Sequence, residues 1–151
     1  MVLSLISEET GEVRSKMVPD VAAATLEKAI SDEVVLSETE LVTDEALGYK
    51  VVGRRTASHE SVNHNEDEYV RVEEDCTVVT TNPIEAFFSQ LKRSVDGTHH
   101  HISKEHLHRY LAEHDFRYST RDLSDAQRMT DLMQSVGGRR LSWRPLTARQ
   151  V

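Results

Sequence analysis

The segment from Asn82 to Lys92, NPIEAFFSQLK, constrains the fold more than any other part of the chain, because it fixes the start and the buried face of one helix. Asn82 is a favourable helix cap, and Pro83 suits the first helical position. Apolar residues then recur at positions 84, 87, 88 and 91, which is helical spacing. The pattern predicts an amphipathic helix with one side against a core.

Glu85 in this helix has two possible roles. It follows Asn82 by three residues, which is the capping-box position, where a carboxylate accepts a hydrogen bond from the N–H of the cap. It also precedes Lys92 by almost two helical turns, so that a carboxylate and an ammonium lie in one row beside the apolar stripe. The first role is structural, whereas the second suits a metal-dependent phosphoryl-transfer site.

Several stretches of sequence carry a resemblance to a known family. The most specific patterns are NHxxxEYV, TNxIExFxSxLKR and GTxHHxSKxHLxRYLxE, all within residues 62–121. GEVRSKMVPDVAAATL at 11–26 and LVTDEALGY at 41–49 precede them, and GGRRLSWRPL at 137–146 follows. Over nearly its whole length the chain resembles bacterial insertion-sequence transposases of the ISXO-like type, which are DDE enzymes.

The resemblance implies a fold and an activity. The implied fold is α/β and RNase H-like, a mixed sheet flanked by helices, over residues 1–138, with a basic tail at 139–151. The implied activity is DNA transposition, in which DNA at the transposon ends is cleaved and joined by two-metal phosphoryl transfer. Mg²⁺ or Mn²⁺ is the implied cofactor, because hard cations prefer oxygen ligands.

The resemblance also implies roles for individual residues. Asp44, in the TDE segment, matches the family's second acid, and Glu85 matches the third, so both are expected to bind metal and act in catalysis. Lys92 matches a basic residue that follows the third acid on the same helix in the family, and it is expected to act in catalysis. The residues expected to contact DNA are Asn82, Lys92, Arg93, His100, Lys104 and Arg109.

The family's first acid has no match in this chain. Family members place it on a strand that precedes the segment corresponding to Val2–Ile6, and the first seven positions contain no acidic residue. The resemblance therefore predicts an N-terminally truncated domain that lacks the first strand of its sheet, which would leave neighbouring backbone groups unpaired. We expect little or no strand transfer by this chain alone.

Three functional hypotheses remain open. The chain is a transposase that becomes active when another chain supplies the missing acid, or it is a non-catalytic remnant that binds element DNA, itself or the full-length transposase. The third hypothesis is an unrelated acidic α/β binding domain. Metal-dependent nicking of element-end DNA separates the first two, and an absence of both DNA and Mg²⁺ binding would identify the third.

Composition and charge are compatible with a cytoplasmic DNA-processing protein. The 151 residues suit one domain with a core, and no apolar run is long enough for a membrane span or a secretory signal. A single cysteine, Cys76, fits a reducing compartment. The net charge of −8 has the wrong sign for DNA, but residues 76–151 carry 11 basic and 8 acidic side chains. We therefore expect DNA contacts to come from the second half.

Six histidines between positions 99 and 114 raise the question of a zinc site. Zinc sites need a convergent set, such as two histidines four residues apart on a helix or a cysteine pair, and neither spacing occurs here. His114 lies on an apolar helix face and is expected in the core. The histidine cluster therefore does not predict a dedicated zinc site.

The rest of the pattern predicts short elements. Strands at Val2–Ile6 and Glu12–Val18 should form a hairpin, and a strand at Val34–Val42 should end beside Asp44, a frequent place for functional carboxylates. The other expected elements are a helix over Pro19–Ile30, an irregular polar stretch over Gly48–Asp75 with one strand at Glu68–Val72, a strand at Thr77–Val79, a helix over Ser103–Tyr118, and a helix from Ser124 to Gly137 that packs Ala126, Met129, Met133 and Val136.

Overall fold

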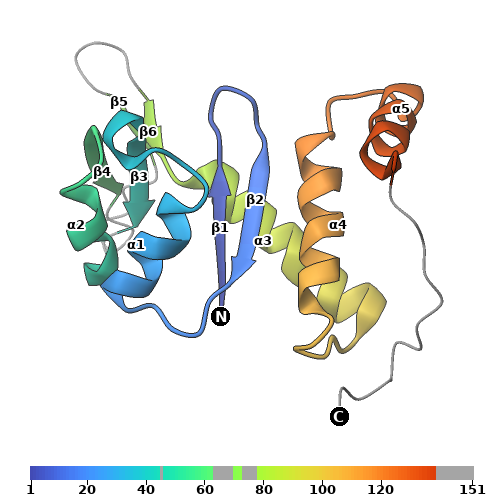
Figure 1. Ribbon diagram of the computed structural model, residues 1–151, viewed down its shortest axis with the longest axis horizontal. Helices are drawn as coiled ribbons and strands as arrows, with labels where there is room; N and C mark the ends of the chain where they lie inside the picture. Colours follow the sequence, from blue (N-terminus) through green and yellow to red (C-terminus); the bar gives the residue numbers. More distant parts are fainter. Residues whose placement is uncertain (45, 63–69, 73–77, 139–151) are drawn as a thin grey trace. The chain divides into compact units, whose positions relative to one another are not determined.

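Helices and strands are both present in the computed structural model, which describes residues 1–44, 46–62, 70–72 and 78–138. The elements in chain order are β1 (Val2–Ile6), β2 (Val13–Met17), α1 (Ala23–Ser31), η1 (Leu36–Glu38), β3 (Glu40–Asp44), α2 (Leu47–Gly53), β4 (Ser58–Val62), β5 (Val70–Val72), β6 (Val78–Thr80), α3 (Asn82–Ser94), η3 (Val95–His99), α4 (Leu107–Ser119) and α5 (Asp125–Val136) (Figure 1). The α/β class is thereby confirmed. The described strands pair as three two-stranded sheets, β1–β2, β3–β4 and β5–β6.

The chain forms two compact units, residues 1–119 and residues 120–151. The predicted tail at 139–151 lies outside the described residues, as does Cys76. Among the helices that the structure describes, none is long and apolar enough to cross a membrane.

The predicted hairpin of β1 and β2 is confirmed. The two strands are antiparallel, with Val2 opposite Met17 and Ile6 opposite Val13. In the turn, the Gly11 N–H donates to the Ser7 carbonyl over 2.8 Å, and Gly11 has a φ of 68°. Glycine adopts this left-handed conformation without the steric cost of a side chain, so the turn closes where the sequence predicts it.

Side chains of the hairpin contribute to two apolar clusters because successive residues of a strand point to opposite faces. The first cluster joins β1 to α1, β3 and α2, and its buried members are Leu3, Val18, Leu26, Ala29, Ile30, Leu41 and Val52. The second joins the hairpin to α3 and α4, and its buried members are Val13, Phe87, Leu91, Leu111 and Tyr118. Both faces of the hairpin are therefore covered.

The segment before Asp44 differs in part from its prediction. The prediction of a strand at Val34–Val42 was wrong for its first half, where η1 forms instead. There the Thr39 hydroxyl donates to the Val35 carbonyl over 2.9 Å. The strand proper is β3, which pairs in parallel with β4 and has Asp44 as its last residue. The predicted position of this acid at the end of a strand is confirmed.

The prediction of an irregular stretch after Gly48 was wrong up to Val62, because this part of the chain contains most of α2 and all of β4. Helix α2 buries only Val52, and β4 reads SHESV with only Val62 buried. Such polar segments lack a clear apolar period, and packing against the first cluster and pairing with β3 position them. β5 and β6 confirm the strands predicted at Glu68–Val72 and Thr77–Val79 as far as the structure describes them. Residues 68, 69 and 77 lie outside the described residues.

Helix α1 starts later than predicted. The Asp20 side chain accepts a hydrogen bond of 3.0 Å from the Ala22 N–H, so Pro19 and Asp20 form the turn that precedes the helix. Helix α4 begins at Leu107 rather than Ser103, because a turn closed by the His106 N–H and the Ser103 carbonyl comes first. The apolar face of α4 is confirmed by the burial of Leu111 and Tyr118.

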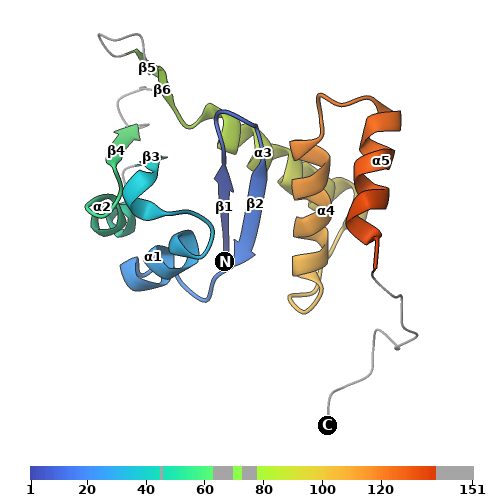
Figure 2. The ribbon, with the colours of Figure 1, turned by 45° about the horizontal axis from the view of Figure 1, so that its top comes forward.

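Helix α4 lies beside β2 in both views (Figures 1 and 2) and is attached to it by polar contacts. The Ser15 N–H and hydroxyl donate to the two carboxylate oxygens of Asp115, each over 2.7 Å. The Val13 N–H donates to the Ser119 hydroxyl over 2.9 Å. These bonds attach side chains of α4 to β2.

Helix α5 begins as predicted, with Ser124 and Gln127 forming a capping box. The predicted packing of its apolar face was wrong, because Ala126, Met129, Met133 and Val136 are all exposed. Within the described part of residues 120–151, no second helix or strand is present against which they could be buried.

Candidate active site

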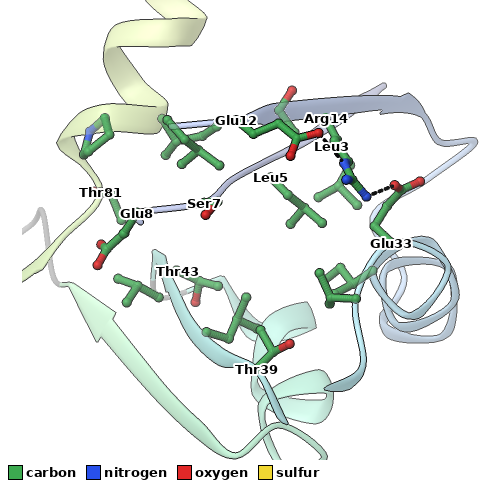
Figure 3. Close-up of a pocket in the computed structure, with 18 of the residues that line it drawn as sticks. Leu3, Leu5, Ser7, Glu8, Glu12, Arg14, Glu33, Thr39, Thr43 and Thr81 are labelled. Carbon is green, nitrogen blue, oxygen red and sulfur yellow. Dashed lines mark hydrogen bonds and ion pairs between the residues drawn. The ribbon is translucent and has the colours of Figure 1, made fainter. Parts of the chain in front are cut away.

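A cavity of about 890 Å³ lies between β1 and β3, with the start of α3 as a further wall (Figure 3). Asp44 and Glu85 both line it, although one ends a strand and the other begins a helix. Seven acidic side chains line the cavity, and Arg14 is the only cation among its described lining residues. The cavity therefore collects the two acids singled out by the sequence within a strongly acidic surface.

Asp44 is exposed at the end of β3. Its Oδ1 accepts a hydrogen bond of 3.2 Å from the Ala46 N–H, so the carboxylate closes the turn that leads into α2. An Asp side chain that bonds the backbone two residues ahead is a common turn device. Because a carboxylate has two oxygens and about four acceptor sites, this contact leaves capacity for a metal ion.

His59 and Thr43 support the strand end that carries Asp44. The Thr43 hydroxyl donates to the Asp44 carbonyl over 2.8 Å and lies 2.8 Å from His59 Nε2. A hydroxyl has one proton, so in this arrangement it accepts from His59 Nε2–H. A Cβ on Gly53 would lie 2.2 Å from His59 Nδ1, so α2 packs directly against the ring because residue 53 is glycine.

The charge of Asp44 affects the pKa of Tyr49 in α2. Burial raises the pKa of the Tyr49 phenol, and the negative charge of Asp44 raises it further. The phenol is therefore neutral at physiological pH, and Tyr49 also lines the cavity. Sequence reasoning assigned no role to Tyr49, His59 or Gly53, because their relation to Asp44 depends on the packing of α2.

Glu85 is exposed in the first turn of α3 and is bonded to the helix cap. Asn82 was wrongly predicted as that cap: Thr81 occupies the position, and Asn82 is the first helical residue. The Thr81 hydroxyl donates to Glu85 Oε1 over 2.7 Å, and the Glu85 N–H donates to the Thr81 carbonyl over 3.1 Å. The predicted capping-box position of Glu85 was therefore wrong, because with Thr81 as the cap the third helical residue is Ile84. Glu85 instead accepts from the side chain of the cap residue and also lines the cavity.

The other predicted site residues do not line the cavity. Asn82, Lys92, Arg93, His100, Lys104 and Arg109 are all exposed. Lys92 and Arg93 lie in the last turn of α3. His100 has a φ of 55°, and the His101 N–H donates across it to the His99 carbonyl over 2.6 Å. The structure thus brings Asp44 and Glu85 to one cavity and leaves the predicted DNA-contacting residues elsewhere on the surface.

The donor set at the cavity suits a hard divalent cation. Mg²⁺ is often bound by one or two protein carboxylates, with water and substrate phosphate completing its six ligands. Asp44 and Glu85 are both carboxylates that line the cavity. In the part of the chain that the structure describes, no three His, Cys, Asp or Glu side chains are grouped to bind a metal. The described histidines therefore form no zinc site of the usual composition.

Comparison with known proteins gives one match. Residues 1–119 match the family described as the ISXO2-like transposase domain. The matched range is the same as the first compact unit of the structure. No curated protein and no solved structure matches the chain.

Proposed function

Since this chain belongs to the ISXO2-like transposase domain family, with a role in DNA transposition, we propose that Asp44 and Glu85 form a divalent-metal site for DNA cleavage and joining on an RNase H-like framework. The observation that carries the proposal is that both carboxylates line one cavity although they come from different elements. A metal ion bound there would activate the attacking oxygen or stabilise the leaving oxygen at a DNA phosphate.

The chain's own residues have distinct roles in this proposal. Asp44 and Glu85 bind Mg²⁺ or Mn²⁺, and the Thr43–His59 contact positions the strand end that carries Asp44. Lys92, seven residues after Glu85 on α3, contacts DNA phosphate together with Arg93. Asn82, His100, Lys104 and Arg109 extend the DNA-contacting set, since they are exposed and polar or basic.

Asp44 and Glu85 are two of the three acids that family members use. We propose that they bind metal but do not suffice for cleavage, and that a third carboxylate, such as one that a full-length transposase supplies, completes the site. The coarser assignment, a role in DNA transposition, follows from the family match and does not depend on this point.

A second candidate is a non-catalytic remnant that binds element DNA or the full-length enzyme. It is favoured by the finding that, among the described residues, no three metal-binding side chains converge. Both candidates predict DNA binding, so cleavage in the presence of a complementing partner separates them.

The test is complementation of a family transposase that retains its first acid but has its second and third acids replaced by amides. We expect the mixture with this chain to nick supercoiled plasmid carrying that partner's element ends when Mg²⁺ or Mn²⁺ is present. The same mixture with Glu85→Gln in this chain should not nick. Binding without nicking in every mixture would favour the remnant.

The DNA-contacting set has its own test by fluorescence anisotropy with a labelled duplex. Replacing both Lys92 and Arg93 by Ala should weaken DNA binding and reduce the slope of log Kd against log salt concentration by roughly two. Lys50→Ala with Arg54→Ala is a matched control, because these exposed cations lie in the acidic half. Equal effects from the two pairs would contradict the assignment.

A further inference from the structure

Tyr49 of α2 lines the cavity together with Asp44 and Glu85. Its side chain is partly buried and packs against the first apolar cluster. A tyrosine combines an apolar ring with a polar tip, and the hydroxyl of a buried tyrosine usually has a hydrogen-bond partner. The partner of the Tyr49 hydroxyl is therefore a question that bears on what the cavity binds.

The position of Tyr49 is set by packing of its neighbours in α2. A Cβ on Gly48 would lie 2.9 Å from Leu26 Cδ1 and 3.0 Å from the Val21 carbonyl oxygen, so α2 lies directly against α1 because residue 48 is glycine. Val52, three residues after Tyr49, is buried in the first apolar cluster. These contacts hold the tyrosine in place without the help of its hydroxyl.

The Tyr49 hydroxyl forms no hydrogen bond with a described residue. Burial and the charge of Asp44 raise the pKa of the phenol, and no hydrogen bond accompanies these two effects. Among the described side chains that are not exposed, the polar atom that is both fully inaccessible and without a partner is Ser103 Oγ. The Tyr49 hydroxyl therefore keeps access to solvent, and its proton is available to a ligand.

Other donors on the cavity wall already have partners in the protein. Arg14 is paired with Glu12 and Glu33, over 3.0 and 3.4 Å. Threonine hydroxyls of the wall donate to protein oxygens, namely those of Thr39, Thr43 and Thr81. Tyr49 thus provides a neutral donor on a wall where the carboxylates only accept.

We propose that the Tyr49 hydroxyl donates a hydrogen bond to a non-bridging oxygen of the DNA phosphate at this site, an inference that rests on the metal site proposed above. The carboxylates of the cavity repel phosphate unless a cation neutralises them, so the contact forms only when metal and DNA are both bound. Asp44 and Tyr49 interact through space without a hydrogen bond between them, which leaves room for a ligand oxygen. A bond from a hydroxyl to an anionic oxygen is stronger than one between neutral groups. Tyr49 is therefore a substrate-binding residue.

The test uses Tyr49→Phe, which removes the hydroxyl and keeps the ring that packs in the cluster. Fluorescence anisotropy with a labelled DNA duplex, with Mn²⁺ or with EDTA, measures how much the ion strengthens DNA binding. We expect Tyr49→Phe to lose roughly tenfold of this strengthening, with Kd in EDTA unchanged and Mn²⁺ affinity, from electron paramagnetic resonance, also unchanged. Tyr110→Phe is the control, because it removes a tyrosine hydroxyl from a residue outside the cavity wall.

NMR of the protein labelled with carbon-13 at tyrosine Cζ gives a readout that a purely structural role would not change. The Tyr49 resonance, identified by its absence in Tyr49→Phe, should shift on addition of duplex DNA when Mg²⁺ is present and not when it is absent. Tyr118 is an internal reference, since its hydroxyl donates to the Pro83 carbonyl over 3.0 Å.

Three results would overturn the role of Tyr49 while leaving the metal site intact. They are equal strengthening by Mn²⁺ in wild type and Tyr49→Phe, an equal loss in Tyr110→Phe, and a Tyr49 resonance that DNA and Mg²⁺ together do not shift. A wild type that binds no Mn²⁺ would overturn the metal site and the role of Tyr49 together. Electron paramagnetic resonance before DNA is added identifies that case.

Discussion

The Thr81 hydroxyl donates a hydrogen bond of 2.7 Å to the Glu85 carboxylate at the start of α3. The same carboxylate lines the cavity that Asp44 reaches from the end of β3. The structural role of Glu85 and its proposed metal-binding role are therefore compatible, because one oxygen of a carboxylate can accept from the cap while the other binds a cation.

Glu85→Gln separates the two roles of this residue. The amide oxygen can still accept from the Thr81 hydroxyl, so we expect the free energy of unfolding to change by less than about 0.5 kcal/mol. The loss of charge should weaken Mn²⁺ binding at least roughly tenfold. Urea denaturation and metal titration measure the two effects, and a variant that binds Mn²⁺ normally but unfolds more readily would leave only the structural role of Glu85 as the partner of the Thr81 hydroxyl.

Gly53→Ala should destabilise the protein by about 1–3 kcal/mol, because the added methyl group would meet the His59 ring at 2.2 Å. Gly97→Ala is the control, since a Cβ there meets nothing within 4 Å. The control should be neutral or slightly stabilising. Equal thermal stability of the two variants would mean that α2 does not pack on His59 as described.

Asp115 gives a pH dependence with a definite sign. Burial raises the pKa of this carboxyl above its ordinary value of 3.8, against the opposing effect of the hydrogen bonds from Ser15. Its contribution to stability is then fully present below the unfolded-state pKa and is lost as pH rises through the folded-state pKa. The stability of the wild type relative to Asp115→Asn should therefore be greatest near pH 3.5 and fall towards pH 7.

Urea denaturation of both proteins across this pH range measures the difference. Asp115→Asn can keep both contacts with Ser15, because the amide oxygen can accept from the Ser15 N–H while the amide nitrogen donates to the Ser15 hydroxyl, so the variant removes mainly the titrating charge. A difference that grows as pH rises would show that the hydrogen bonds, rather than burial, dominate the pKa of Asp115.

Local sequence signals predicted part of this structure well. The helix around Phe87 and Leu91, the Ser7–Gly11 turn and the Ser124 cap each follow from a few adjacent residues, and the structure contains all three. Thr81 rather than Asn82 became the α3 cap, although either residue type is suited to that position. A shift of one residue at a helix boundary is beyond what such local signals decide.

Segments fixed by tertiary packing were not predictable in the same way. Helix α2 has one buried residue, and β4 is mostly polar, so neither carries a strong period. The Thr43–His59 contact joins residues that only the parallel pairing of β3 and β4 brings together. Sequence reasoning could choose Asp44 and Glu85 by resemblance, but it could not give their shared cavity or its acidic rim.

The central claim is that Asp44 and Glu85 bind one divalent ion together. Mn²⁺ titration followed by electron paramagnetic resonance tests it with wild type, Asp44→Asn, Glu85→Gln, the double variant and Glu40→Gln, a control from the same cavity. We predict one shared ion, at least roughly tenfold weaker binding in each single variant, and a double variant whose loss is smaller than the sum of the single losses. Unchanged binding in either single variant, or an equal loss in Glu40→Gln, would contradict the shared site.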